Sequence, residues 1–120
     1  MTEKRIILEM GTGNDLYGQD YTKAARRAVQ DALHHSSITL FSKLGISHED
    51  MRVQVTIGVQ QPDAVDCDLV ASDLPRGRAF VRAVKGGLDV EDAGAGTRHV
   101  IATAAIEAYL PDLKGQFVAS

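Results

Sequence analysis

The sequence contains no tryptophan, a single cysteine and few aromatic residues of any kind. With aromatic residues at only 5% of 120, the core must be built from valine, isoleucine, leucine and alanine. The lone Cys67 excludes an internal disulfide. Asp66 and Asp68 beside it would raise the pKa of its thiol, so we interpret it as a small hydrophobic residue rather than a nucleophile. No apolar run approaches the roughly 20 residues that cross a bilayer.

The N-terminus lacks the long apolar region of a signal peptide, since Met1–Arg5 is followed only by Ile6–Leu8. Thirteen Lys and Arg against sixteen Asp and Glu give a net charge of -3, which offers no electrostatic reason to expect nucleic acid or an anionic membrane as partner. No histidine lies at zinc-ligand spacing, and no motif such as Gly-x-Ser-x-Gly marks a nucleophile. We therefore expect a cytoplasmic protein without a metal or cofactor.

Residues 1–120 have the length of one domain, with a tail over 111–120 that we expect to be frayed. Hydrophobic patterns predict alternating strands and helices. In chain order they indicate a strand over Lys4–Met10, a helix from Tyr21, a second helical piece over Ile38–Leu44, a strand over Met51–Val59, a short helix starting near Asp66, and a strand over Arg78–Lys85 that Leu88–Val90 extends. Glu91–Gly96 is predicted to be a loop and the best candidate for mobility.

Two elements have the clearest patterns. Asp20 is the predicted N-cap of the helix from Tyr21, whose inner face is a stripe of alanines. Apolar and polar residues alternate strictly over Met51–Val59, which is typical of a strand with one buried face. His99–Leu110 is ambiguous, because its alanines favour a helix while its alternation favours a strand. We favour a strand, since a sheet of three would be thin for this length.

The resulting order, β-α-β-α-β-β, predicts an α+β fold: a mixed sheet with helices on one face. A single layer of helices cannot cover both sides of a sheet, so the second face is exposed to solvent or buried against another subunit. We favour a homo-oligomer. The residues expected on that second face are Gln54, Thr56, Arg82, Glu107, Ile101 and Ala105.

The segment Gly11–Asp20 holds three glycines and two aspartates between a strand and a helix. Glycine is used where backbone turns or comes close to another group, so we interpret the segment as a binding or assembly loop. Its spacing does not match a phosphate loop, and its carboxylates suit a cation or a group with hydrogen-bond donors. An Asx-turn followed by a helix cap is the structural alternative. The predicted ligand-binding residues here are Gly11, Gly13, Asp15, Tyr17, Gly18, Gln19 and Asp20.

Further charged residues accompany this loop. Lys23, with its neighbours on the predicted helix, could hold a substrate carboxylate, although a solvated helix face explains these charges more simply. Arg82, Lys85 and Glu107 fall on the final strands and could converge on a pocket at a subunit boundary. Charges paired within the sheet are the alternative. Lys85 precedes two glycines that would let a ligand or a second backbone approach.

The chain resembles a small family of conserved hypothetical proteins, the Lin family, whose marker is Gly-x-Gly-x-Asp-x-His-Gly near the N-terminus. Here the marker reads Gly11-Thr12-Gly13-Asn14-Asp15-Leu16-Tyr17-Gly18, and the resemblance continues through Val53–Val59, Gly86–Leu88 and Ala104–Glu107. Tyr17 stands where the family has histidine. A tyrosine can donate a hydrogen bond but does not titrate near neutral pH. The family has no established function to carry over.

The element order also looks like the trimeric chorismate-mutase-like architecture, shared by small enamine deaminases and ring-opening amidohydrolases. In those assemblies ligands sit in clefts between subunits. This resemblance implies a trimer or a multiple of it, but element order does not fix function. The Ser–Lys pair of the amidohydrolases has no clear counterpart here.

Three functions remain open at this point. The first is an oligomer that binds a small polar metabolite where the Gly11–Asp20 loop meets the Arg82, Lys85 and Glu107 surface of a neighbour. The second is an enzyme that uses Asp15 or Glu107 as acid or base on a small polar metabolite, cyclic ones included. The third is a purely structural role, in which the loop only locks subunits together. We prefer binding over catalysis.

Overall fold

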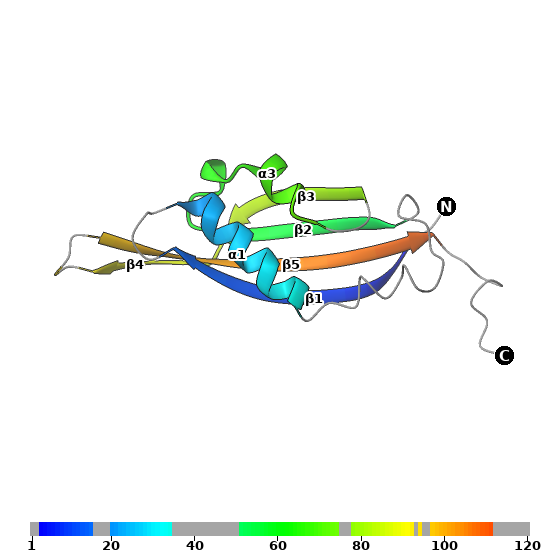
Figure 1. Cartoon of the computed structure of the whole chain (residues 1–120), viewed down its shortest axis with the longest axis horizontal. Coiled ribbons are helices and arrows are strands. Elements are labelled where there is room, and N and C mark those ends of the chain that lie inside the picture. Colours follow the sequence, from blue (N-terminus) through cyan, green and yellow to red (C-terminus); the bar gives the residue numbers. More distant parts are fainter. Residues whose placement is uncertain are drawn as a thin grey trace.

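The computed structural model describes residues 3–15, 20–34, 51–74, 78–92, 94 and 97–111. The elements are β1 (Glu3–Asp15), α1 (Tyr21–His34), β2 (Arg52–Val59), the single 3-10 turn η2 (Pro62–Ala64), α3 (Cys67–Ala71), β3 (Arg78–Lys85), β4 (Leu88–Asp92) and β5 (Thr97–Pro111). Both helices lie on one face of a mixed sheet (Figure 1), so the predicted α+β fold is confirmed. The helical piece predicted over Ile38–Leu44 and the tail after Pro111 lie outside the described residues.

The sheet is organised around β5. The strand order is β1-β5-β2-β3, with β5 antiparallel to both of its neighbours and β2 parallel to β3. β5 is fifteen residues long and extends past the end of β2, where β4 pairs with it instead. β4 and the start of β5 therefore form an end of the sheet that projects beyond α1 (Figure 1). The strand prediction for His99–Leu110 is confirmed.

The expectation that Leu88–Val90 extends β3 is wrong. After β3 the chain shifts sideways to the position next to β5 that β2 occupies earlier in the sheet, and the Gly86 N–H donates to the Val59 carbonyl at 2.9 Å. Gly87 makes the turn with φ of 59°, and a Cβ on it would lie 2.2 Å from the Ile101 carbonyl oxygen. Only glycine fits this position, and the segment that follows forms the separate strand β4.

The Gly-x-Gly part of the expected loop is strand as well. β1 does not end at Met10 but continues to Asp15, with Gly11 and Gly13 facing α1. A Cβ on Gly11 would lie 2.4 Å from the Ala32 backbone nitrogen, and one on Gly13 would lie 2.2 Å from the Ala28 nitrogen. These glycines are required because the backbone of α1 lies directly on the backbone of β1.

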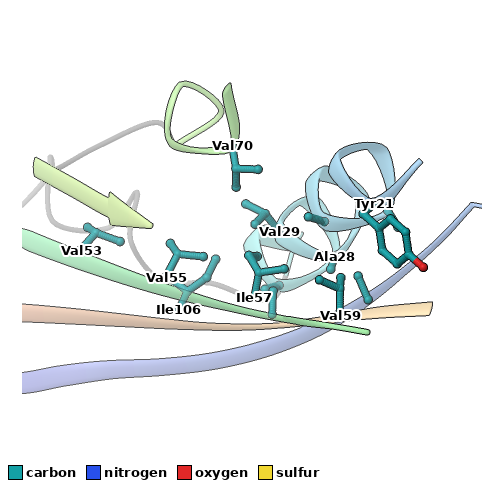
Figure 2. Packing of buried hydrophobic residues seen from close by; sticks show 14 of the residues in the cluster. Tyr21, Ala28, Val29, Val53, Val55, Ile57, Val59, Val70 and Ile106 are labelled. Carbon is teal, nitrogen blue, oxygen red and sulfur yellow. The ribbon is translucent and has the colours of Figure 1, made fainter. Parts of the chain in front are cut away.

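The core lies between the helices and the sheet. Val29 of α1 and Val70 of α3 point toward Val55 and Ile57 of β2 (Figure 2). The helical stripe of alanines and the strict alternation of β2 are both found as predicted. The fully buried members include Ala24, Ala25, Ala28, Val29, Ala32, Val53, Val55, Ile57, Val59, Val70, Val100, Ala102, Ile106 and Ala108.

The opposite side of the sheet, called here the helix-free face, carries every second strand residue. Gln54, Thr56, Arg82, Glu107, Ile101 and Ala105 share it by register, as predicted. This face is more apolar than the sequence indicated. Among the described residues, seven large hydrophobic side chains are exposed, and six of them belong to this face, each 41–70% exposed: Leu8, Met10, Phe80, Val84, Leu88 and Val90.

We expect Gly13→Ala to lower the free energy of unfolding by about 3 kcal/mol, because the new methyl group meets α1 backbone that cannot move aside. Urea denaturation followed by circular dichroism measures this. Thr12→Ala, one residue away on the exposed side of β1, should change stability by no more than about 0.5 kcal/mol. Equal stabilities for the two variants would contradict the close packing of α1 on β1.

Candidate functional site

The start of α1 is held by two aspartates. Asp20 caps the helix as predicted, since its Oδ1 accepts from the Lys23 N–H at 3.0 Å. Asp15, the last residue of β1, is only 4% exposed, and its Oδ2 accepts from the Asp20 N–H at 2.8 Å. Its Oδ1 lies 3.8 Å from Arg27 and 4.0 Å from Lys23. A buried negative charge is thus placed against the positive end of a helix dipole, which ties α1 to β1.

The same helix covers part of the outer edge of the sheet. The Thr12 N–H donates to Oδ2 of Asp31 at 3.0 Å, and the Arg27 guanidinium donates to the Asn14 carbonyl. These bonds satisfy backbone groups of an edge strand that would otherwise be open to pairing. The polar residues of the Gly11–Asp15 segment are therefore engaged in attaching α1.

The sequence does not predict a half-buried cluster of Tyr21, Asp89 and Arg98. Asp89 of β4 accepts from the Tyr21 hydroxyl, and Arg98 lies 3.8 Å from the same carboxylate oxygen. The other oxygen, Oδ1, is buried and has no hydrogen-bond partner among the described residues. Burial, and then the bond to Asp89, raise the pKa of Tyr21. By register Asp15, Val100 and Asp89 form one row across three strands, close to the start of α1. The alternation of Leu88, Asp89 and Val90 in the sequence indicates that Asp89 lies on the opposite face from its two neighbours, but it does not indicate that Asp89 meets Tyr21.

The outer side of α1 borders a groove of about 460 Å³. Its cations include Lys23, Arg26 and Arg27, and each faces a carboxylate. Arg26 makes a two-point contact with Asp73, at 2.8 and 3.0 Å, which joins α1 to the segment after α3. These residues hold elements together rather than point into an empty space.

Glu107 lies on the helix-free face in a positive setting. It accepts from the Tyr109 hydroxyl at 2.6 Å and from Arg5 at 3.3 Å. The hydrogen bond from Tyr109 is the largest cause of the lowered pKa of Glu107, and Arg5 and the charge of Arg82 lower it further. The guanidinium of Arg52 stacks over Tyr109 with its carbon 4.3 Å from the ring centre. Glu107 is therefore ionised at neutral pH.

An open depression of about 600 Å³ is centred on the helix-free face. The residues at its floor have small side chains. Gly58 pairs with Thr103 there, and a Cβ on Gly58 would lie 2.6 Å from the Thr103 hydroxyl. Nearby, Arg82 donates to the Thr56 hydroxyl at 3.2 Å. The residues that line the depression are Met10, Gly11, Thr12, Asp31, Thr56, Gly58, Val84, Lys85, Gly86, Thr103, Ala104 and Ala105.

The sheet thus separates the predicted site residues into two groups. Gly13, Asp15, Asp20 and Lys23 are on the helix side, whereas Arg82 and Glu107 are on the helix-free face. Gly11 and Lys85 both border the depression. Tyr17, Gly18 and Gln19 lie outside the described residues.

The remaining chemical groups are sparse. Within the described ranges, no cluster of three or more His, Cys, Asp or Glu is placed to hold a metal ion. Burial, then the charges of Asp68 and Asp66, raise the pKa of the Cys67 thiol, which makes it a poor nucleophile at neutral pH. In the part of the chain that the structure describes, no helix is long and apolar enough to cross a membrane.

Asp15→Asn should lower the free energy of unfolding by about 1–2 kcal/mol, because it removes a buried charge that faces the helix dipole, Lys23 and Arg27. Thermal and urea unfolding of the variant measure the change. Glu91→Gln is the matched control, since that side chain is 76% exposed and its ion pair is worth little. The assignment of Asp15 as the anchor of α1 fails if both variants match the parent protein.

Glu107 should give an acid-dependent contribution to stability. Its pKa is lowered in the folded protein, so the contribution is present above the ordinary value of 4.5 and is lost as the pH falls below it. Urea midpoints of the parent and Glu107→Gln should therefore differ at neutral pH and converge in acid. Tyr109→Phe removes the hydrogen bond that is the main cause of the lowered pKa of Glu107, so it should weaken the pH dependence of stability. A difference that grows in acid would contradict this sign.

Comparisons with known proteins agree with this fold. A family described as conserved hypothetical protein, Lin0512_fam, matches residues 5–108. A solved structure from Nostoc punctiforme PCC 73102, described as an FtsZ-like protein of unknown function, is 32% identical to this chain, covers 93% of it and 99% of that protein, and superposes with a TM-score of 0.80. No curated protein matches. The family expected from the Gly-x-Gly-x-Asp marker is thus confirmed, and the chain belongs to the Lin0512 family of conserved hypothetical proteins.

Proposed function

We propose that this protein is the subunit of a homo-oligomer that binds a small polar metabolite between subunits. The helix-free faces of neighbouring copies meet, and the depression around Gly58 and Thr103 becomes a closed cleft. A trimer, or a multiple of it, is the expected state, and the cytoplasm is the expected compartment. The Nostoc protein is itself described as of unknown function, so the argument rests on the geometry of this chain.

The observation that carries the proposal is the apolar content of the helix-free face. Six large hydrophobic side chains, 41–70% exposed, lie on one face of one sheet, and such patches mark interaction sites on proteins. The five strands have 49 residues in all, and each residue covers about 16 Å² of a sheet. The face is therefore on the order of 800 Å², similar to the area that each partner buries in a stable interface.

The depression supports a ligand of polar character. Its lining includes Thr12, Thr56 and Thr103, whose side chains share the helix-free face by register. Hydroxyls both donate and accept, so they suit an oxygen-rich molecule. An open depression leaves much of a ligand in water, whereas binding sites bury most of the ligand surface. A second subunit would supply the missing cover.

Binding is favoured over catalysis by the state of the two candidate carboxylates. Asp15 is buried against α1 and is already held by Asp20, Arg27 and Lys23. Glu107 has a lowered pKa, so it carries no proton to donate near neutral pH and is a weak base. The enzyme alternative would need a group from another subunit.

A purely structural assembly is the second alternative. The same apolar face supports this alternative, but a purely structural role does not explain why small residues leave a depression in that face. The two are separated by whether the purified oligomer retains a small molecule.

Light scattering and native mass spectrometry of the purified protein test the proposal. We expect an oligomer with a bound small molecule, and we expect Leu88→Lys, on the 59% exposed residue of β4, to weaken association by tenfold or more. Leu69→Lys is the control, because Leu69 is 40% exposed but belongs to α3 on the other side. A monomeric parent protein, or equal loss of assembly in both variants, would overturn the interface.

A further inference from the structure

The end of the sheet beyond α1 is a two-stranded arm. β4 (Leu88–Asp92) pairs with the first five residues of β5 (Thr97–Ile101), and we call these two segments the arm. β1 ends at Asp15, opposite Val100, so only β4 and β5 continue past that point (Figure 1). A two-stranded ribbon has little stability in water unless one of its faces packs against another surface.

Polar contacts fix the arm on its helix side. The Tyr21 hydroxyl donates to Asp89, which joins the arm to the first residue of α1. The guanidinium of Arg98 on β5 lies 3.3 Å from Glu91 and 3.8 Å from Asp89, so it bridges the two strands of the arm. The direction in which the arm projects is therefore set within the chain itself.

The other side of the arm is apolar and open to water. Leu88 and Val90 point to the helix-free face, where they are 59% and 47% exposed. By register Ile101 lies beside Leu88 on the same face. Because the polar side is already tied to α1, the apolar side is the one that a partner can cover.

The depression on the helix-free face has the complementary shape. It begins two residues further along β5 than the arm, where Thr103 pairs with Gly58. Small residues such as Gly58 and Ala105 leave it hollow, whereas Leu88 and Val90 stand out from the same face. Every chain thus offers one raised apolar surface and one hollow. A closed assembly of identical chains satisfies both in every subunit, because each arm meets the depression of a neighbour.

A chain cannot place its own arm over its own depression. The two are parts of one sheet and face the same way, and Ile101, opposite Leu88, is four residues from Ala105, or about 14 Å along β5. A second copy, turned face to face with the first, brings an arm and a depression together. The helix-free face, on the order of 800 Å², is large enough for such a contact.

We propose that the arm of one subunit lies over the depression of its neighbour, and that Leu88 and Val90 form the apolar side of the intersubunit cleft. This inference rests on the proposed function, because it requires helix-free faces to meet. It adds the segment of the neighbour that completes the site. The depression measures about 600 Å³, far more than two aliphatic side chains occupy, so the arm closes the cleft and leaves room for a ligand.

Cysteine cross-linking tests this contact. In a Cys67→Ser background, Leu88→Cys and Ala105→Cys are introduced together and the protein is treated with a mild oxidant. Within one chain the two Cα atoms are about 14 Å apart, well beyond the roughly 7 Å that a disulfide spans, so a disulfide between them joins two subunits. We expect the monomer band on a non-reducing gel to shift to linked species.

Leu69→Cys combined with Ala105→Cys is the matched control, because Leu69 is exposed on α3 at the other side of the sheet, and this pair should not shift. Equal cross-linking by Leu88→Cys alone would mean that arms meet each other, and it would overturn the inference. A band that links Leu88→Cys to a different protein would overturn it too. If Leu88→Cys itself weakens assembly, Val90→Cys repeats the test from the same face.

Light scattering on the same samples separates this inference from the proposed function. An oligomer in which neither Leu88→Cys nor Val90→Cys links to Ala105→Cys contradicts the arm contact alone. A monomeric parent protein contradicts the meeting of helix-free faces itself.

Discussion

The direct contact between the backbones of α1 and β1 is the constraint on which the rest of the structure depends. Gly11 and Gly13 leave no side chain between strand and helix, and alanines on α1 complete the contact. Because α1 lies so close to β1, the side chains of Asp31 and Arg27 bond to the backbone of β1, and the side chain of Asp15 bonds to the start of the helix. The Gly-x-Gly-x-Asp marker therefore has a structural explanation, because its three alternate residues on β1 form the surface on which α1 packs.

The two faces of the sheet have consequently taken different chemical roles. On the helix side, the buried Asp15 and the half-buried Asp89 lie beside donors near the start of α1. On the other side the charged residues are mainly arginines, interspersed with exposed hydrophobic side chains. The net charge of the whole chain averages over the two faces and does not reveal this difference.

Periodicity predicted the elements whose pattern is local. α1 and β2 were identified because each has one unambiguous repeat, and Asp20 was identified as a cap from its type and position. The sequence predicts a loop over Gly11–Asp15, because glycine breaks strands more often than it marks a strand on which a helix packs closely. The strand character of Leu88–Val90 is predicted, but its separation from β3 is not, because the sideways shift of the chain depends on the positive φ of Gly87. The Tyr21–Asp89 bond joins residues 68 positions apart, and no local signal encodes it. The division of the predicted site residues between two faces likewise required the register.

On the helix-free face, hydrophobic and charged side chains have opposite effects on burial. Burying the exposed hydrophobic residues would be favourable, because apolar surface would leave water. Burying the arginines of the same face would cost free energy unless each met an acceptor, because a guanidinium keeps its charge. Glu107 provides such an acceptor within the chain, since it accepts from Arg5 and Tyr109. The hydrophobic residues would therefore provide the driving force for covering this face, and the charged residues would restrict which surface could cover it.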